Sequence, residues 1–190
     1  CIDWGPFFQA WELSGPYPAI LDDPVVGEAA RSVLAEGRAM LKRVIEGRWL
    51  TASGTVGFWP ANAVGDDIVL WTDESRATPA LTWRNLRQQA ERPPGKPHQC
   101  LADFVAPVGT PDYVGAFAVT AGIGIERKLA EFTQAHDDYS ALMLKTLADR
   151  LAEAFAEWLH RRVRVELWGY APGEALPNDA LIREAYRGIR

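Results

Sequence analysis

Two acidic pairs are the residues whose spacing most directly suggests chemistry. Asp149 and Glu153 lie four positions apart in a stretch with helical periodicity, so they share one face of a helix. Like charges at this spacing destabilise an exposed helix by roughly 0.2–0.5 kcal/mol. Either neighbouring arginines relieve the repulsion on a solvated surface, or this acidic edge faces a cation, such as an arginine or an ammonium or sulfonium ligand.

The second pair, Asp66 and Asp67, follows the turn-forming residues Asn62 and Gly65. The ordinary interpretation is a hairpin loop with solvated carboxylates. Cys100 could act as a nucleophile, but no histidine stands beside it, and an isolated cysteine in a buried strand usually serves packing. A hydrolase built on Cys100 or on the aspartate pair is therefore the least supported functional hypothesis.

Other common catalytic and metal-binding patterns are missing from the sequence. His98, His136 and His160 lie far apart, none has the spacing of a zinc ligand pair, and each is expected at the surface or its rim. There is no Gly-x-Ser-x-Gly elbow and no phosphate-binding loop, and the short GIG at 122–124 lacks the context of a dinucleotide fingerprint. The sequence therefore predicts no catalytic side chain and no metal site.

Composition narrows the class of protein. The chain has 190 residues and a formal net charge of −5, which argues against non-specific nucleic-acid binding. The basic stretch HRRVR (160–164) is interpreted as a solvated helix end. Cys1 and Cys100 make no disulfide framework, and the apolar run 114–125 is too short to span a membrane. No secretory signal is present, so a cytoplasmic protein is expected.

Helical periodicity predicts the elements that must position these residues. Asp137 or Asp138 caps the strongest helix, a long amphipathic one that continues to about Arg162. Asn178 is expected to cap the last helix and Gly188 to end it. The expected helices cover residues 24–47, 78–92, 126–135, 137–162 and 179–187.

Strand-like runs occur in adjacent pairs between these helices. They cover residues 54–60, 66–72, 100–107, 112–122 and, after the long helix, 163–171. The order is not a regular alternation of strand and helix, so a doubly wound parallel sheet is not expected. The sequence favours a single α+β domain over residues 1–190, with a twisted antiparallel sheet and flanking helices.

Several stretches, taken in order, carry a resemblance to one known family. They are IDWGPFFQAWEL (2–13), FWPANAVGDDI (58–68), LRQQ (86–89), CLADFVAP (100–107), DYVGAFAVTAG (112–122), DDYSALMLKTLADRLAEAFAEWLH (137–160) and WGYA (168–171). Together they resemble the activation (reactivation) domain of cobalamin-dependent methionine synthase. The matches extend over nearly all of the chain, and the family fold is also α+β with a twisted antiparallel sheet.

The resemblance implies a function that needs no catalytic side chain. The enzyme of this family is a 5-methyltetrahydrofolate–homocysteine S-methyltransferase whose cobalamin is occasionally oxidised to inactive cob(II)alamin. Its activation domain binds S-adenosylmethionine and presents the methyl group to cobalt, while a flavodoxin-like or diflavin reductase supplies the electron. The cobalamin is carried by a neighbouring domain, so the contribution expected here is positioning, with little stand-alone activity.

The resemblance also implies which residues bind the ligand. Asp3 matches the family aspartate that holds the amino group of S-adenosylmethionine, and Arg190 matches the arginine that binds its carboxylate. Glu153 and Glu184 correspond to acidic positions near that arginine and have a supporting role. Arg190 would open the family motif Arg-Pro-Ala-Pro-Gly-Tyr-Pro, so the chain is expected to be a domain truncated at its C-terminus and excised from a longer protein.

A competing hypothesis assigns no ligand to the domain. In it, the chain folds and contacts the cobalamin domain or the flavoprotein reductant as a docking module. Binding of S-adenosylmethionine discriminates between the two hypotheses.

Overall fold

A computed structural model describes residues 2–188 of the chain and divides it into two compact units. The first unit comprises residues 1–54 and 118–190, and the second comprises residues 55–117. The helical elements of the first unit are α1 (Gly5–Gln9), η1 (Ala19–Asp22), α2 (Gly27–Glu46), α3 (Ile125–Gln134), α4 (Asp138–Arg162), η3 (Val163–Leu167) and α5 (Asn178–Ile182).

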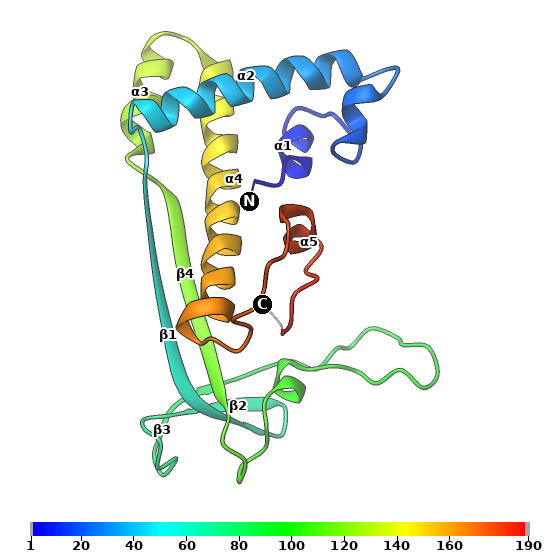
Figure 1. Ribbon diagram of the computed structural model, residues 1–190, viewed down its shortest axis with the longest axis vertical. Coiled ribbons are helices and arrows are strands. Elements are labelled where there is room, and N and C mark those ends of the chain that lie inside the picture. The colour runs from blue at the N-terminus through cyan, green and yellow to red at the C-terminus, as the bar shows by residue number, and fades with distance from the viewer. Residues whose placement is uncertain (1, 189–190) are drawn as a thin grey trace. The chain divides into compact units, whose positions relative to one another are not determined.

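The strands form one sheet of order β3-β2-β1-β4. They are β1 (Thr51–Val64), β2 (Asp67–Trp71), β3 (Pro79–Trp83) and β4 (Tyr113–Ile123), and a 3₁₀ turn η2 (Leu101–Phe104) precedes β4. The long strands β1 and β4, both labelled in Figure 1, each have residues in both units. The chain combines helices with an antiparallel sheet and does not alternate strand and helix regularly, so the predicted α+β class is confirmed.

Helix α2 carries a stripe of buried residues at intervals of three and four, as an amphipathic helix requires. One of them is Gly37, and the reason is visible in its neighbour: a Cβ built there would lie 2.6 Å from Cζ of Phe7. The phenylalanine ring therefore occupies the space that a side chain would take. This contact locks α1 against α2 within the core of the first unit.

Helix α4 begins where the sequence predicted. The carboxylate of Asp137 accepts a hydrogen bond from the backbone nitrogen of Ser140 at 2.9 Å, which caps the helix. The helix then continues for 25 residues, and α2 crosses it near its amino-terminal end (Figure 1). Its buried residues Met143, Leu144 and Leu147 pack with Phe7, Phe8 and residues of α2.

The second unit is organised by the hairpin of β1 and β2. Val64 pairs with Asp67 across a two-residue turn, and Gly65 has a φ of 63°, as the first central position of a type II′ turn requires. Strand β2 then pairs with β3, which begins at Pro79 on the sheet edge. The core of this unit is the cluster of Ala61, Ile68, Leu70, Cys100 and Ala102.

The helix predicted over 78–92 is wrong. Residues 79–83 form strand β3, and the chain that follows has no regular structure. Val69 pairs with Thr82 and Ile68 pairs with Trp83, so the sheet supplies backbone partners that the local sequence does not reveal. Tertiary pairing has overridden helix propensity here.

The strand predicted over 100–107 is also wrong. Its first half is the 3₁₀ turn η2, because the carboxylate of Asp103 accepts a hydrogen bond from the backbone nitrogen of Cys100 at 2.8 Å. A side chain that bonds the backbone three residues away offers it a partner other than a strand.

The predictions after α4 fail in two places. Residues 163–167 continue the helix as a single π turn rather than starting a strand over 163–171. The last helix, predicted over 179–187, is the short α5; Pro177 occupies its cap position, so Asn178 does not cap it. Glu184, two residues beyond its end, has a φ of 54° and stops the helix.

Candidate functional site

Asp3 precedes helix α1 by two residues in the sequence, and α1 is anchored in the core of the first unit by Phe7 and Phe8. The Oδ1 of Asp3 accepts a hydrogen bond from the backbone nitrogen of Gly5 at 2.9 Å, and the side chain is partly buried. Two residues further, Phe7 and Phe8 are fully buried, and α1 packs against α4. The carboxylate is thus held by a rigid element, and its Oδ2 has no hydrogen-bond partner among residues 2–188.

The acidic edge of α4 consists of two groups with different surroundings. The exposed carboxylate of Asp149 pairs with the guanidinium of Arg150, so the solvated interpretation fits this residue. Glu153, one turn further, is exposed and has no ion-pair partner within the described part of the chain. A cation facing this edge would therefore meet Glu153 rather than the pair.

The remaining predicted ligand residues lie at the end of the chain. Glu184 is exposed, just beyond α5. Arg190 lies outside the described residues 2–188. That Asp3 and Arg190 converge on one ligand stays a prediction.

The structure reveals a buried polar cluster that the sequence interpretation missed. Arg164 was expected in a solvated helix end, yet its side chain is completely buried. Its Nε and Nη2 donate to the two carboxylate oxygens of Glu174 at 2.7 and 2.6 Å, and its Nη1 lies 2.7 Å from Nδ1 of His160. The guanidinium also stacks on the ring of Tyr186, 3.9 Å from its centroid.

The expectation that every histidine lies at the surface is wrong for His160, which is 5% exposed. Burial, and then the neighbouring charge of Arg164, lowers the pKa of His160 to about 4. The imidazole is therefore neutral at pH 7, and its Nδ1 accepts the hydrogen bond from Arg164. The Arg164 hydrogen bonds lower the pKa of Glu174, so this carboxylate is ionised.

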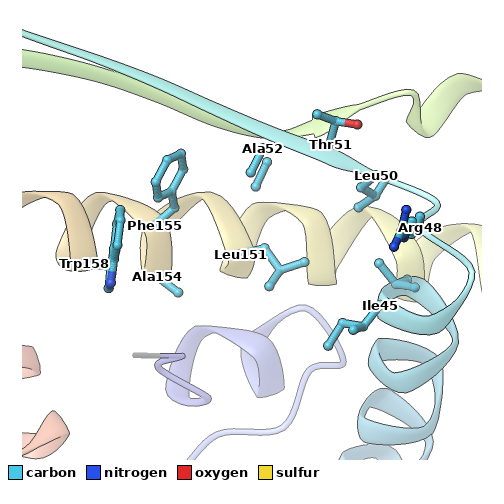
Figure 2. A pocket seen from close by; sticks show the side chains of 11 residues that line it. Ile45, Arg48, Leu50, Thr51, Ala52, Leu151, Ala154, Phe155 and Trp158 are labelled. Atoms are coloured by element: carbon cyan, nitrogen blue, oxygen red, sulfur yellow. The ribbon is translucent and has the colours of Figure 1, made fainter.

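An apolar trough of about 640 Å³ lies between α4 and the start of β1 (Figure 2). Leu151, Phe155 and Trp158 line it from α4, and Leu50 lines it from the chain before β1. Arg48 is a single charged group at its edge. A zwitterionic ligand needs both an anion and a cation, so this trough does not match one.

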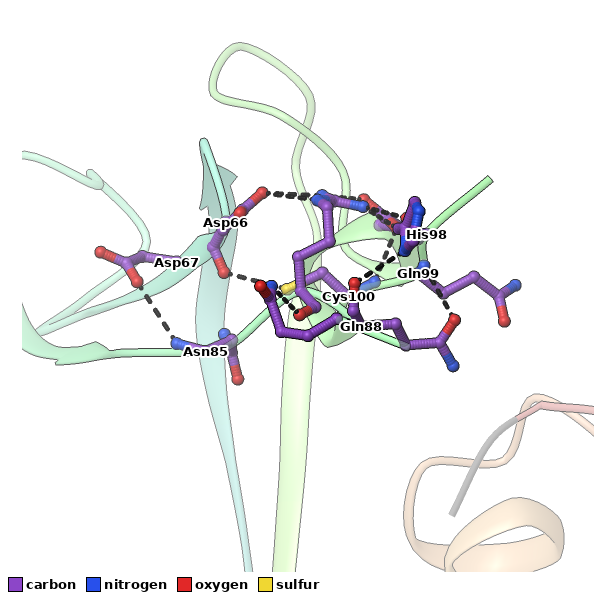
Figure 3. A network of polar contacts seen from close by, with 10 residues as sticks. Asp66, Asp67, Asn85, Gln88, His98, Gln99 and Cys100 are labelled. Carbon is purple, nitrogen blue, oxygen red and sulfur yellow. Dashed lines mark hydrogen bonds and ion pairs between the residues drawn. The ribbon is translucent and has the colours of Figure 1, made fainter. Parts of the chain in front are cut away.

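The aspartates at the β1–β2 turn belong to a structural network (Figure 3). Arg87 donates to Asp66 at 2.7 Å and to Asp103 at 2.7 and 2.8 Å, and Asp67 pairs with Arg84. The thiol of Cys100 is buried and donates to the backbone oxygen of Asp66 at 3.3 Å. Structural contacts therefore explain Asp66, Asp67 and Cys100, and no hydrolytic role is needed for them.

Within residues 2–188, no group of three or more histidine, cysteine, aspartate or glutamate side chains is placed to hold a metal ion. No helix in this part of the chain combines the length and the apolar character needed to cross a bilayer.

Comparison with known proteins agrees with the fold and extends over the whole chain. Residues 1–190 match the family described as "Vitamin B12 dependent methionine synthase, activation domain". Among solved structures, the chain is similar to the MetH reactivation domain bound to AdoHcy, at 51% sequence identity and a TM-score of 0.93. This match covers 100% of the chain and 58% of the other protein, so the chain spans somewhat over half the length of that structure. The chain belongs to the family of activation domains of vitamin B12-dependent methionine synthase.

Proposed function

We propose that this chain binds S-adenosylmethionine and presents its methyl group for the reductive methylation of cob(II)alamin, which reactivates methionine synthase. The observation that carries the proposal is the similarity, at 51% identity and over the full chain, to a reactivation domain bound to AdoHcy. AdoHcy is what remains of S-adenosylmethionine once the methyl group has left. A site that accommodates one of these molecules suits the other, because they differ by this methyl group and its sulfonium charge.

The chemistry of Asp3 fits one end of this ligand. Its carboxylate is partly buried and directed by the Gly5 hydrogen bond, and its second oxygen can accept a charge-assisted bond from the ligand's ammonium group. We assign the ligand's carboxylate to Arg190, whose guanidinium fork matches a carboxylate in shape. Glu153 and Glu184 are assigned supporting roles near that arginine.

When bound, S-adenosylmethionine supplies an electrophilic methyl group on a sulfonium. The chain's own residues hold the amino-acid end of the ligand and so orient the methyl group, which supplies catalysis by proximity rather than by acid or base chemistry. We assign the cobalamin to a neighbouring domain of the same enzyme and the electron to a flavodoxin-like or diflavin reductase. The reaction is assigned to the cytoplasm.

Calorimetry tests the proposal on the full-length gene product that contains these residues. Titration with S-adenosylmethionine and with AdoHcy is expected to give saturable binding at a single site. Label from methyl-labelled S-adenosylmethionine is then expected in the cobalamin when a low-potential reductant is present. No saturable heat with either ligand at millimolar concentration would contradict the proposal and favour a docking module without a ligand.

A further inference from the structure

Helix α4 is buried to different degrees in its two halves. In the first half, Met143, Leu144 and Leu147 are fully buried in the core that α1 and α2 share with this helix. In the second half, Leu151 is only partly buried and Trp158 is 42% exposed. An apolar face is stabilised when it is removed from water, so an amphipathic helix normally has a cover along its whole length. Within residues 2–188, the second half of α4 has no complete cover.

The partly exposed face lines the apolar trough between α4 and the start of β1 (Figure 2). The volume of the trough, about 640 Å³, leaves room for several large side chains. Among its lining residues only Arg48 and Thr51 are polar, and Ile45 of α2 is 65% exposed beside it. Apolar surfaces of this kind mark places where another apolar surface packs.

Arginines lie at both ends of the trough. Figure 2 shows Arg48 at one end and Trp158 at the other. Trp158 also lines a smaller pocket of about 360 Å³, together with Arg161 and Arg162. Arg162 pairs with Glu166, whereas the exposed Arg48 and Arg161 have no ion-pair partner within residues 2–188. A partner with an apolar centre and a carboxylate near each end would therefore match the trough in polarity and in charge.

We propose that the trough is the packing surface for a further segment of the same polypeptide, outside residues 1–190, with apolar side chains in its centre and acidic ones near both ends. The chain covers 58% of the similar reactivation domain, so about two fifths of that protein lies outside the match. A segment of the same polypeptide packs at a high effective concentration, which favours it over a separate protein. This packing does not depend on the binding of S-adenosylmethionine.

The dimensions of the trough limit the covering segment. Residues 151–162 extend over about 16 Å along α4, at 1.5 Å per residue. A helix of about eleven residues or an extended strand of about five has this length. The backbone groups of a lone strand would stay unpaired against an apolar surface, whereas a helix bonds its own. The segment is therefore an amphipathic helix.

Photocrosslinking in the full-length gene product identifies what covers the trough. The photoreactive residue p-benzoylphenylalanine replaces Leu151 in one protein and Trp158 in another, because both side chains line the trough. Irradiation is expected to link each position, within one molecule, to the same peptide outside residues 1–190. Mass spectrometry of this peptide should find apolar residues with acidic ones near both ends. Lys145, which is exposed on α4 and does not line the trough, is the control position and should give no such link.

Three results would overturn the proposal. They are links only to residues within 1–190, links to a second copy or to another protein, and no link from either position. The same peptide linked from Lys145 would also count against it. Thermal unfolding is recorded for each protein, and a folding defect at one trough position leaves the other as the test.

Charge reversal tests the acidic ends of the segment. Arg48→Glu and Arg161→Glu each set a carboxylate against them, so the yield of the cross-link is expected to fall at least about twofold. Arg127→Glu, at an exposed position of α3, is the control and should leave the yield unchanged. Unchanged yields in both trough variants would contradict the acidic ends. Titration with AdoHcy reports the proposed function separately, so either proposal can fail alone.

Discussion

The guanidinium carbon of Arg164 lies 3.9 Å from the centre of the Tyr186 ring, although Arg164 belongs to the π turn η3 and Tyr186 follows helix α5. The carboxylate of Glu174, midway between them, closes the arrangement. The π turn that follows α4 is therefore joined to the residues after α5 by contacts between side chains.

His160 is expected to make stability depend on pH. Burial and Arg164 lower its pKa to about 4 in the folded chain, against an ordinary value of 6.5. Between pH 6.5 and 4 the unfolded chain therefore binds a proton that the folded chain does not. The free energy of unfolding should fall as the pH is lowered through this window, by at most about 1.4 kcal/mol per pH unit from this group.

Urea unfolding at several pH values checks the His160 prediction. In His160→Asn the amide oxygen can still accept from Arg164 but does not titrate, so the decline below pH 6.5 should be shallower. His136→Asn, at an exposed position, is the matched control. Identical slopes for His160→Asn and the unmodified protein would contradict the assignment.

The substitution Asp3→Asn tests whether the Asp3 carboxylate binds the ammonium group of the ligand. The amide oxygen retains the hydrogen bond from Gly5, so the local fold is kept while the negative charge is lost. We expect S-adenosylmethionine binding by the full-length protein to weaken by roughly 1.5–3 kcal/mol, the range for hydrogen bonds to charged groups. Ordinary turnover should continue until the cofactor oxidises. The exposed Asp22→Asn serves as control in calorimetry, and unchanged affinity of Asp3→Asn would remove Asp3 from the site.

Asn62→Ala should destabilise the second unit strongly. Its buried amide nitrogen lies within hydrogen-bond distance of the backbone oxygens of Ala106, Pro107 and Thr110, and its oxygen accepts from the indole nitrogen of Trp71. Each buried partner left unmade costs about 1–3 kcal/mol, so a total loss of at least about 3 kcal/mol is expected.

Chemical unfolding of Asn62→Ala is best compared with Asn85→Ala. The Asn85 amide donates one hydrogen bond, to the backbone oxygen of Trp83 at the surface, and its loss should cost no more than about 1 kcal/mol. Similar losses in the two variants would show that the buried bonds of Asn62 contribute little.

Gly37→Ala should destabilise the first unit although alanine favours helices. The gain in helix propensity is about 1 kcal/mol, whereas the clash of the new Cβ with Phe7 at 2.6 Å forces overpacking that costs about 1–3 kcal/mol. A lower Tm is therefore expected, and Phe7→Leu in the same chain should reduce the additional loss. Gly122→Ala, where nothing lies within 4 Å, is the control, and a raised Tm for Gly37→Ala would contradict this packing.

Long periodic segments could be predicted from the sequence because their signals are local. The α4 helix has its cap at Asp137 and apolar residues at helical spacing, and both its type and its bounds were right. The prediction of a helix over 78–92 was wrong because β3 pairs with β2. Pairing between two strands cannot be predicted from the local sequence of either strand alone. The family fold was indicated by resemblance, and the pattern of paired strands agreed with it.

The candidate site was predictable only in part. Asp3 and Arg190 came from resemblance to the family, since no spacing rule joins two residues at opposite ends of a chain. Arg164 lies in a basic stretch whose other arginines are partly or fully exposed, so composition favoured a solvated helix end. Its partner Glu174 lies across a π turn and an irregular segment, and only the folded chain brings them together.

Glu153 lies on the exposed surface of helix α4, and Arg164 follows about three turns later, in the π turn that continues the helix. Each residue of a helix rotates the next side chain by about 100° around the helix axis. Adding or deleting one residue in this interval would therefore change the direction of the Glu153 side chain relative to that of Arg164 by this angle. Substitutions here can be absorbed one at a time, whereas insertions and deletions cannot. Relatives that do the same job should therefore differ in composition along this interval but keep its length.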